Sequence, residues 1–215
     1  MEIAPFIDHT ALKPQTTFKD VEKLCSEALE WGFASVCINP VFVKHTVKLL
    51  EGSKVLPCTV TGFPLGASAA QVKIYETEKA LNDGAREIDT VINVGAAIEG
   101  DWKNIHKEIS EIAAACKKSD AILKVILETC LLNRSQITEA CKAVVDAGAD
   151  FVKTSTGFSH SGAEVEIVSL MRQTVGESIG VKASGGIRTY EDALKMIDAG
   201  ANRLGSSSGV KLLKP

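Results

Sequence analysis

The sequence predicts an α/β fold, a closed (β/α)8 TIM barrel formed by a single domain over residues 1–215. Two observations lead to this prediction. Helix-like segments alternate with short apolar strand-like segments along the chain, a pattern typical of a parallel sheet with helices outside it. A glycine also stands between a helix and the next strand at four joints, namely Gly32, Gly84, Gly148 and Gly200. Glycine favours the left-handed conformation in which many helices end.

A doubly wound open sheet is the alternative for this alternating pattern. Such a sheet normally has a glycine-rich first turn, and the sequence has no G-x-G-x-x-G motif. The eight strand-like segments match the strand number of the barrel. They are Phe6–Asp8, Ser35–Ile38, Val55–Val60, Glu87–Asn93, Ile122–Glu128, Phe151–Thr154, Val181–Ser184 and Arg203–Gly205.

Helices fill the gaps between these strands, and several begin at residues that commonly cap helices. A capping side chain accepts a hydrogen bond from the first turn, and a polar residue three positions later can return one. Proline after the second strand, at Pro40, is placed to start a helix. The predicted caps are Ser68 with Gln71, Ser135, and Thr189 with Asp192.

Composition narrows the range of functions. The chain has 215 residues, a net charge of -3 and no basic excess that would hold nucleic acid or an anionic membrane. No apolar run reaches the roughly 18 residues of a membrane span, and the N-terminus resembles neither a signal nor a transit peptide. Six cysteines without a C-x-x-C pair indicate buried free thiols. We therefore expect a cytoplasmic protein.

Two lysines stand out because each lies in a β-prone segment followed by a small, polar turn. Lys153 precedes Thr-Ser-Thr-Gly, and Lys182 precedes Ala-Ser-Gly-Gly. Burial lowers the pKa of a lysine, and a lysine with a pKa near 7–8 is a nucleophile or acid–base group at neutral pH. Lys124 is the third lysine in an apolar strand-like run.

A carboxylate accompanies these lysines. Period-2 alternation places Glu87, Asp89, Val91 and Asn93 on one face of the fourth strand, which we expect to point into the barrel. An inward Asp89 needs a cation, and Lys124 is a candidate. The alternative is a buried salt bridge that only stabilises the core. Burying several titratable groups at strand ends costs desolvation free energy, however, so such a cluster favours a functional role.

Glycine and serine residues after the last two strands predict an anion site. In barrels, the loops after strands seven and eight commonly bind phosphate through backbone N–H groups. Gly157 after strand six could add a donor. The candidates after strands seven and eight are Gly185, Gly186, Gly205, Ser207 and Ser208.

The remaining polar candidates are weaker. The four histidines are scattered without the spacing of metal ligands, which disfavours a metal site. Asp8 and His9 end the first strand, where they could contact substrate or form a capped turn. Cys37 could face the cavity, although a packing thiol is the more common role.

These features favour Schiff-base chemistry on a phosphorylated carbonyl compound. A second ammonium at Lys182 would lower the pKa of Lys153 by repulsion, leaving one amine neutral to attack and the other protonated to assist. Asp89 could then move protons with an ordered water. An isomerase barrel with the same phosphate loops would not need Lys153, and a ligand-sensing barrel would lack the lysines.

Seven motifs together resemble those of the deoxyribose-phosphate aldolase family. The resemblance extends over residues 7–209, and the two lysine motifs are the most specific. The motifs are Ile7–Thr10, Ser35–Pro40, Gly62–Gly66, Glu87–Asp89, Lys124–Thr129, Phe151–Phe158 and Val181–Arg188. The resemblance implies a (β/α)8 barrel that reversibly cleaves 2-deoxy-D-ribose 5-phosphate to acetaldehyde and D-glyceraldehyde 3-phosphate, in deoxyribonucleotide catabolism.

The resemblance also implies residue roles. Lys153 resembles the Schiff-base lysine, Asp89 and Lys182 resemble the proton-transfer residues, and Lys124 and Asp8 are expected to support them. The glycines and serines named above match the phosphate-binding loops. No metal or organic cofactor is implied, the partner is a small phosphosugar, and a homo-oligomer, either dimer or tetramer, is compatible. One departure is His160-Ser161, where the family usually has small residues including a glycine.

Overall fold

The computed structural model describes residues 1–213. Its eight strands are β1 (Ile7–Ala11), β2 (Ser35–Ile38), β3 (Leu56–Thr61), β4 (Glu87–Val91), β5 (Ile122–Ile126), β6 (Phe151–Lys153), β7 (Gly180–Ser184) and β8 (Arg203–Ser206). The α-helices are α1 (Phe18–Trp31), α2 (Val43–Leu49), α3 (Ala70–Asn82), α4 (Val94–Glu99), α5 (Trp102–Lys118), α6 (Arg134–Asp146), α7 (Val165–Val175) and α8 (Tyr190–Asp198). Four 3-10 helices are η1 (Ala4–Phe6), η2 (Pro40–Phe42), η3 (Thr129–Leu131) and η4 (Gly209–Leu213).

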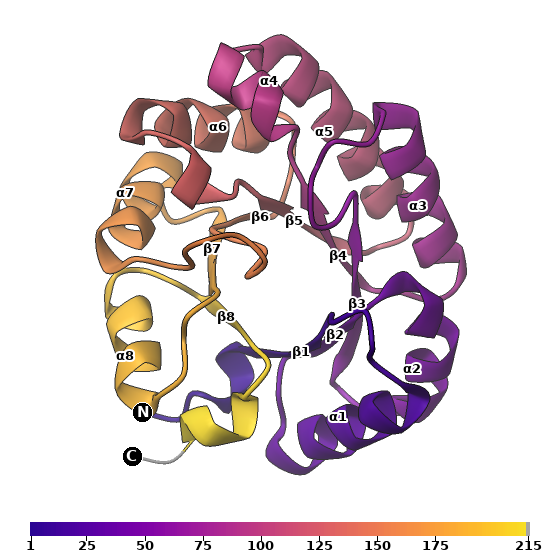
Figure 1. Ribbon diagram of the computed structural model, residues 1–215. Coiled ribbons are helices and arrows are strands. Elements are labelled where there is room, and N and C mark those ends of the chain that lie inside the picture. Colours follow the sequence, from indigo (N-terminus) through magenta and orange to yellow (C-terminus); the bar gives the residue numbers. More distant parts are fainter. Residues whose placement is uncertain (214–215) are drawn as a thin grey trace.

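The strands form one closed, parallel barrel in the order β1 to β8, and β8 pairs with β1. Figure 1 shows the helices as an outer ring around the strands. This arrangement confirms the predicted (β/α)8 barrel and rules out the open doubly wound sheet. Two helices, α4 and α5, follow β4, whereas in the described part of the chain only η4 follows β8.

Three predicted strand ends were wrong by two or three residues, and several other boundaries differ by one. β1 continues past Asp8 because Ala11 still pairs with Ile38 of β2. β4 ends at Val91, and Asn93 instead caps α4 by accepting a hydrogen bond from the backbone of Ala96 (3.1 Å). β5 ends before Glu128, whose backbone has a φ of 54°.

The four joint glycines behave as predicted. Gly32 is the left-handed C-cap of α1, with a φ of 67°. Gly84, Gly148 and Gly200 follow helix ends and also have positive φ values, which glycine adopts without strain. Each glycine therefore ends one helix and turns the chain toward the next strand.

The predicted helix starts were only partly right. Thr189 and Asp192 form the expected reciprocal capping box of α8, and Pro40 opens η2. Ser68 does not cap α3, whose N-cap is Ala69. Ser135 lies inside the first turn of α6, where Asn133 and Gln136 form the capping box instead.

Alternation along the strands separates an apolar outside from a charged inside. Residues such as Val36, Ile88 and Leu123 are fully buried in one large cluster that packs the strands against the helices. A second, small apolar cluster contains Leu12, Cys37, Cys58 and Val60, with Phe63 packed against it. Other inward positions carry the charged side chains that form the candidate site.

Candidate active site

The charged side chains meet because neighbouring strands are in register. Asp89 of β4 pairs with Lys124 of β5, and Lys153 of β6 pairs with Lys182 of β7. Asp8 enters from β1, which closes the barrel against β8. These five predicted residues, distant in sequence, form one buried cluster.

Asp89 is the centre of this cluster. Its Oδ2 accepts hydrogen bonds from Lys153 Nζ and Lys182 Nζ, both at 2.7 Å. Its Oδ1 accepts one from Lys124 Nζ at 2.8 Å. Asp89, Lys124 and Lys182 are completely buried, whereas Lys153 is 3% exposed. Lys153 is therefore the amine of the three that opens to the cavity.

Electrostatics fix the charge of Asp89. Burial by itself would raise its pKa, but Lys124, Lys153 and Lys182 outweigh burial and hold the pKa of this carboxyl well below its usual range. The group therefore stays a carboxylate through neutral pH.

Lys182 differs from the general expectation that burial lowers the pKa of a lysine. Burial does oppose its charge, but Asp8 and Asp89 outweigh burial and raise its pKa above the usual value. Lys182 Nζ contacts Asp8 Oδ2 closely as well as Asp89 Oδ2. This environment holds Lys182 as an ammonium at neutral pH.

A lower layer of charges supports the first. Lys124 Nζ lies 2.6 Å from Glu87 Oε2 and 3.6 Å from Asp8 Oδ2. Arg203 of β8 donates to Asp8 Oδ1 at 2.6 Å and to Glu87 Oε1 at 3.1 Å. The predicted supporting role of Lys124 and Asp8 has this geometric basis, and Arg203 is a residue that the sequence analysis missed.

The charges of the cluster nearly balance. Four cations, Lys124, Lys153, Lys182 and Arg203, face three carboxylates, Asp8, Glu87 and Asp89. Loss of one proton would make this buried set neutral. Lys153 is the lysine of the set that reaches the cavity.

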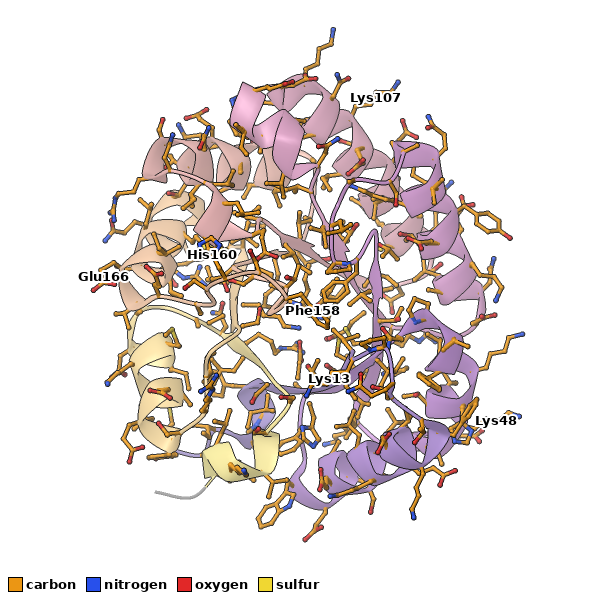
Figure 2. All side chains as sticks on the ribbon, in the orientation of Figure 1. Lys13, Lys48, Lys107, Phe158, His160 and Glu166 are labelled. Carbon is orange, nitrogen blue, oxygen red and sulfur yellow. The ribbon has the colours of Figure 1, made fainter. Side chains whose placement is uncertain are left out.

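An open cavity of about 860 Å³ lies above the cluster. Lys153 lines it, together with all six predicted anion-binding residues, namely Gly157, Gly185, Gly186, Gly205, Ser207 and Ser208. The fold therefore brings the amine and the glycine–serine loops to one cavity. Figure 2 shows that Phe158 lies over the barrel centre, whereas Lys48, Lys107 and Glu166 lie at its periphery.

Glycine is required where the two loops approach one another. A Cβ on Gly162 would lie 2.2 Å from the carbonyl oxygen of Gly185, and Ala163 donates to that oxygen at 3.0 Å. Gly185 itself has a φ of 82°. Gly162 thus lets the loop after β6 dock on the loop after β7.

Further polar residues line the cavity. Thr10, Thr156 and Ser184, which lie in the segments expected to contact substrate or bind an anion, line it together with Arg188. The hydroxyl of Ser184 donates to the backbone oxygen of Ser155 at 2.6 Å. His9 hydrogen-bonds Glu27 of α1 at 2.7 Å and also lines the cavity.

Two thiols lie beside Asp89. The side-chain ligand atoms of Cys37, Cys58 and Asp89 are all within 4.8 Å of one another, the one such group found in residues 1–213. Burial raises the pKa of Cys58 well above its usual value, and Lys124 Nζ, 3.5 Å from its sulfur, already supplies a cation. Cys37 is fully buried, and its hydrogen bond with the side chain of Cys58 lowers the pKa of the Cys37 thiol below its usual value. All six cysteines are free, and Cys130 alone is partly exposed.

The fold and the site define a class of protein: a barrel enzyme with a lysine–carboxylate centre, of the aldolase type. A family model described as DeoC/LacD family aldolase matches residues 3–214. The chain belongs to this family.

Curated relatives cover the whole chain. A deoxyribose-phosphate aldolase of Thermoanaerobacter sp. (strain X514) is 54% identical over 215 residues, which are 100% of this chain and 96% of the relative. One from Caldicellulosiruptor saccharolyticus is 56% identical over 213 residues, or 99% and 97% of the two chains.

Solved structures agree with the fold. A deoxyribose phosphate aldolase of Aeropyrum pernix, described as having a unique tetrameric structure, has a TM-score of 0.92 and 37% identity, and the match covers 98% of this chain and 89% of that one. An aldolase named QR15 has a TM-score of 0.93 and 41% identity, with 98% and 94% covered. None of the helices in residues 1–213 has the length and apolarity to cross a membrane.

Proposed function

We propose that this chain reversibly cleaves 2-deoxy-D-ribose 5-phosphate to acetaldehyde and D-glyceraldehyde 3-phosphate through a Schiff base on Lys153. One observation carries the proposal. The amine of Lys153 lies 2.7 Å from a carboxylate oxygen that also holds Lys182, and it opens to a cavity shared with the anion-binding loops.

The covalent step uses the exposed amine. Lys153 Nζ, once it has lost a proton, attacks C1 of the open-chain sugar and forms a carbinolamine. Loss of water then gives a protonated imine, an electron sink for the next bond cleavage. Lys182, held as an ammonium by Asp8 and Asp89, supplies the proton that the departing hydroxyl needs.

Cleavage separates C2 from C3. A base removes the proton of the C3 hydroxyl, and C3 becomes the aldehyde carbon of glyceraldehyde 3-phosphate. The bonding electrons pass to C2 and give an enamine on Lys153. Protonation of C2 followed by hydrolysis releases acetaldehyde and restores the amine. Asp89, a carboxylate between the two lysines, moves protons in these steps through an ordered water.

The phosphate end is held by the loops after β7 and β8. Backbone N–H groups around Gly185, Gly186 and Gly205 and the hydroxyls of Ser207 and Ser208 suit an anion. Gly157 belongs to the same cradle. The cavity that they share with Lys153 supports a substrate that has its phosphate on these loops and C1 on Lys153.

The wider setting follows from the same reaction. The substrate is a soluble phosphosugar, so we propose a cytoplasmic enzyme of deoxyribonucleotide catabolism that needs no metal or organic cofactor. We also propose that it forms a homo-oligomer, either a dimer or a tetramer.

Steady-state cleavage of 2-deoxyribose 5-phosphate tests this function. We expect turnover in the wild type, loss of all measurable turnover in Lys153→Ala, and normal turnover in Lys142→Ala. Lys142 is an exposed lysine of α6 that pairs with Glu139, and it is therefore a matched control. A folded Lys153→Ala variant with near-normal turnover would contradict the proposal.

A further inference from the structure

Glu128, which follows β5, has an unusual backbone conformation. In residues 1–213, Asp120 and Glu128 are the two non-glycine residues with a positive φ, 50° and 54°. Asp120 lies in an exposed turn, whereas Glu128 is only 4% exposed. A glycine would adopt this left-handed conformation without strain, and residues held in it cluster at functional sites. A buried glutamate at this position therefore indicates that its side chain has a role.

The conformation of Glu128 shifts the pairing between the ends of β5 and β6. The N–H group of Leu127 donates to the backbone oxygen of Lys153 at 2.9 Å, and that of Thr129 donates to the backbone oxygen of Thr154 at 3.0 Å. The pairing advances by two residues after β5 and by one after β6, so Glu128 is an extra residue, as in a β-bulge. Bulges commonly redirect a side chain, and here the carboxylate is directed at the loop after β6.

The carboxylate of Glu128 holds the middle of that loop. Its Oε1 accepts a hydrogen bond from the backbone N–H group of Thr156 at 3.2 Å, and its Oε2 accepts one from the Thr156 hydroxyl. The hydroxyl oxygen of Thr156 in turn accepts a hydrogen bond from the backbone N–H group of Phe158 at 3.1 Å. These three hydrogen bonds fix the turn of residues 156–158, in which Gly157 has a φ of 82°.

The start of the same loop has a different support. Thr154 Oγ1 donates to the backbone oxygen of Ser184 at 3.2 Å, and Ser184 Oγ donates to the backbone oxygen of Ser155 at 2.6 Å. Residues 154 and 155 are therefore held by β7, whereas the turn that follows them is hydrogen-bonded to Glu128. Loss of the carboxylate should loosen the turn and leave Lys153 in place.

The turn of residues 156–158 borders the cavity, although Glu128 does not. In residues 1–213, the lining of the cavity includes Thr156, Gly157 and Phe158 but not Glu128. Gly157 belongs to the proposed phosphate cradle, and a Cβ on it would lie 3.9 Å from the Cα of Gly185. The position of the Gly157 N–H group relative to the loop after β7 therefore depends on the turn.

We propose that Glu128 is a positioning residue, which acts through Thr156 to hold the N–H group of Gly157 at the anion site. This inference rests on the proposed function, because it concerns the phosphate end of the substrate. Glu128 lies outside the cavity, so its loss should weaken substrate binding and leave the Schiff-base chemistry unchanged. A variant that raises KM at constant kcat has lost binding that is equal in the ground and transition states.

Glu128→Gln tests the role of the carboxylate. The amide has nearly the same shape but replaces one acceptor oxygen with an NH2 donor, so it cannot accept both hydrogen bonds from Thr156. We expect KM for 2-deoxyribose 5-phosphate to rise about 10-fold, the scale of one lost hydrogen bond to a charged group. The kcat value, kcat/KM for unphosphorylated deoxyribose and borohydride trapping of acetaldehyde should stay at their wild-type values.

Glu108→Gln is the matched control for a purely structural effect. Glu108 is also a buried glutamate, but it pairs with Lys73 at 2.8 Å on the outside of the barrel. Its replacement should lower stability and leave KM unchanged. An unchanged KM in a folded Glu128→Gln enzyme, or equal losses for the phosphorylated and unphosphorylated sugars, would overturn the inference.

Thr156→Val and Thr156→Ser give a second test if Glu128→Gln does not fold. Valine removes the hydroxyl that links Glu128 to Phe158, whereas serine retains it. KM should rise about 10-fold in Thr156→Val and stay at the wild-type value in Thr156→Ser. Equal KM values in the two variants would overturn the inference. Absence of cleavage and of acetaldehyde trapping in the wild type would instead defeat the proposed function.

Discussion

Replacement of Asp89 by asparagine should weaken the fold as well as the chemistry. The carboxylate is completely buried and accepts hydrogen bonds from three ammonium groups, at 2.7, 2.7 and 2.8 Å. Asparagine has nearly the same shape but no charge, so it leaves those ammoniums facing one another. Removing one partner of a buried ion pair costs about 3–5 kcal/mol.

This loss should be visible in unfolding experiments. We expect the free energy of unfolding to fall by about 3–5 kcal/mol at pH 7.5 in urea titrations. For a chain of this size, such a loss lowers the melting temperature by about 10 °C. Asp146→Asn is the control, because Asp146 is exposed on α6 and its replacement should change stability by less than about 0.5 kcal/mol.

The pH dependence checks the cause. The pKa of Asp89 in the fold lies well below its value of about 3.9 in the unfolded chain, so its stabilisation is present above pH ~4 and is lost as the pH falls through the folded pKa. The difference between wild type and Asp89→Asn should therefore persist from about pH 5 to pH 8 and shrink in acid. A folded Asp89→Asn with wild-type stability at pH 7.5 would refute the reasoning.

Three other predictions concern activity. Asp89→Asn should lower kcat for cleavage by about 10²-fold or more, the usual scale for a positioned acid–base group; near-normal kcat would remove Asp89 from proton transfer. Lys182→Met removes the ammonium that Asp8 and Asp89 hold beside Lys153, so kcat should fall by about 10²-fold or more because a proton donor is lost, and near-normal kcat would remove Lys182 from proton transfer. Ser207→Glu places a negative charge in the anion site and should reduce kcat/KM for 2-deoxyribose 5-phosphate far more than for unphosphorylated deoxyribose, whereas equal losses would make the loop structural.

The charged centre could be predicted because strand position carries the information. Asp89, Lys153 and Lys182 are charged residues in apolar strand-like runs, and a parallel barrel directs alternate residues of each strand inward. The glycine–serine loops were identifiable for the same reason, since they follow the last two strands. The site could be predicted from the sequence because its residues occupy equivalent positions, within or just after successive strands, in a repeating fold.

Arg203 and Lys73 show why other residues could not be predicted. Arg203 begins a four-residue strand with little apolar context, and its partners Asp8 and Glu87 lie far away in sequence. Lys73 lies on α3 and reads as a surface residue, yet it is completely buried, with Glu108 Oε1 at 2.8 Å and the backbone oxygen of Val91 at 2.9 Å. Both depend on contacts that only the folded chain creates.

Helix starts were less predictable because nearby capping residues compete. Ser135 is a good N-cap type, but Asn133 and Gln136 form reciprocal hydrogen bonds and begin α6 two residues earlier. The sequence offers both solutions, and the reciprocal pair satisfies two backbone groups rather than one.

The central claim is that Lys153 is the covalent nucleophile, and peptide mass spectrometry after borohydride reduction with acetaldehyde tests it most directly. We predict one reduced two-carbon adduct per chain, located on Lys153 and absent from Lys153→Ala. An adduct located mainly on Lys182 or Lys124 in the wild-type protein would contradict it.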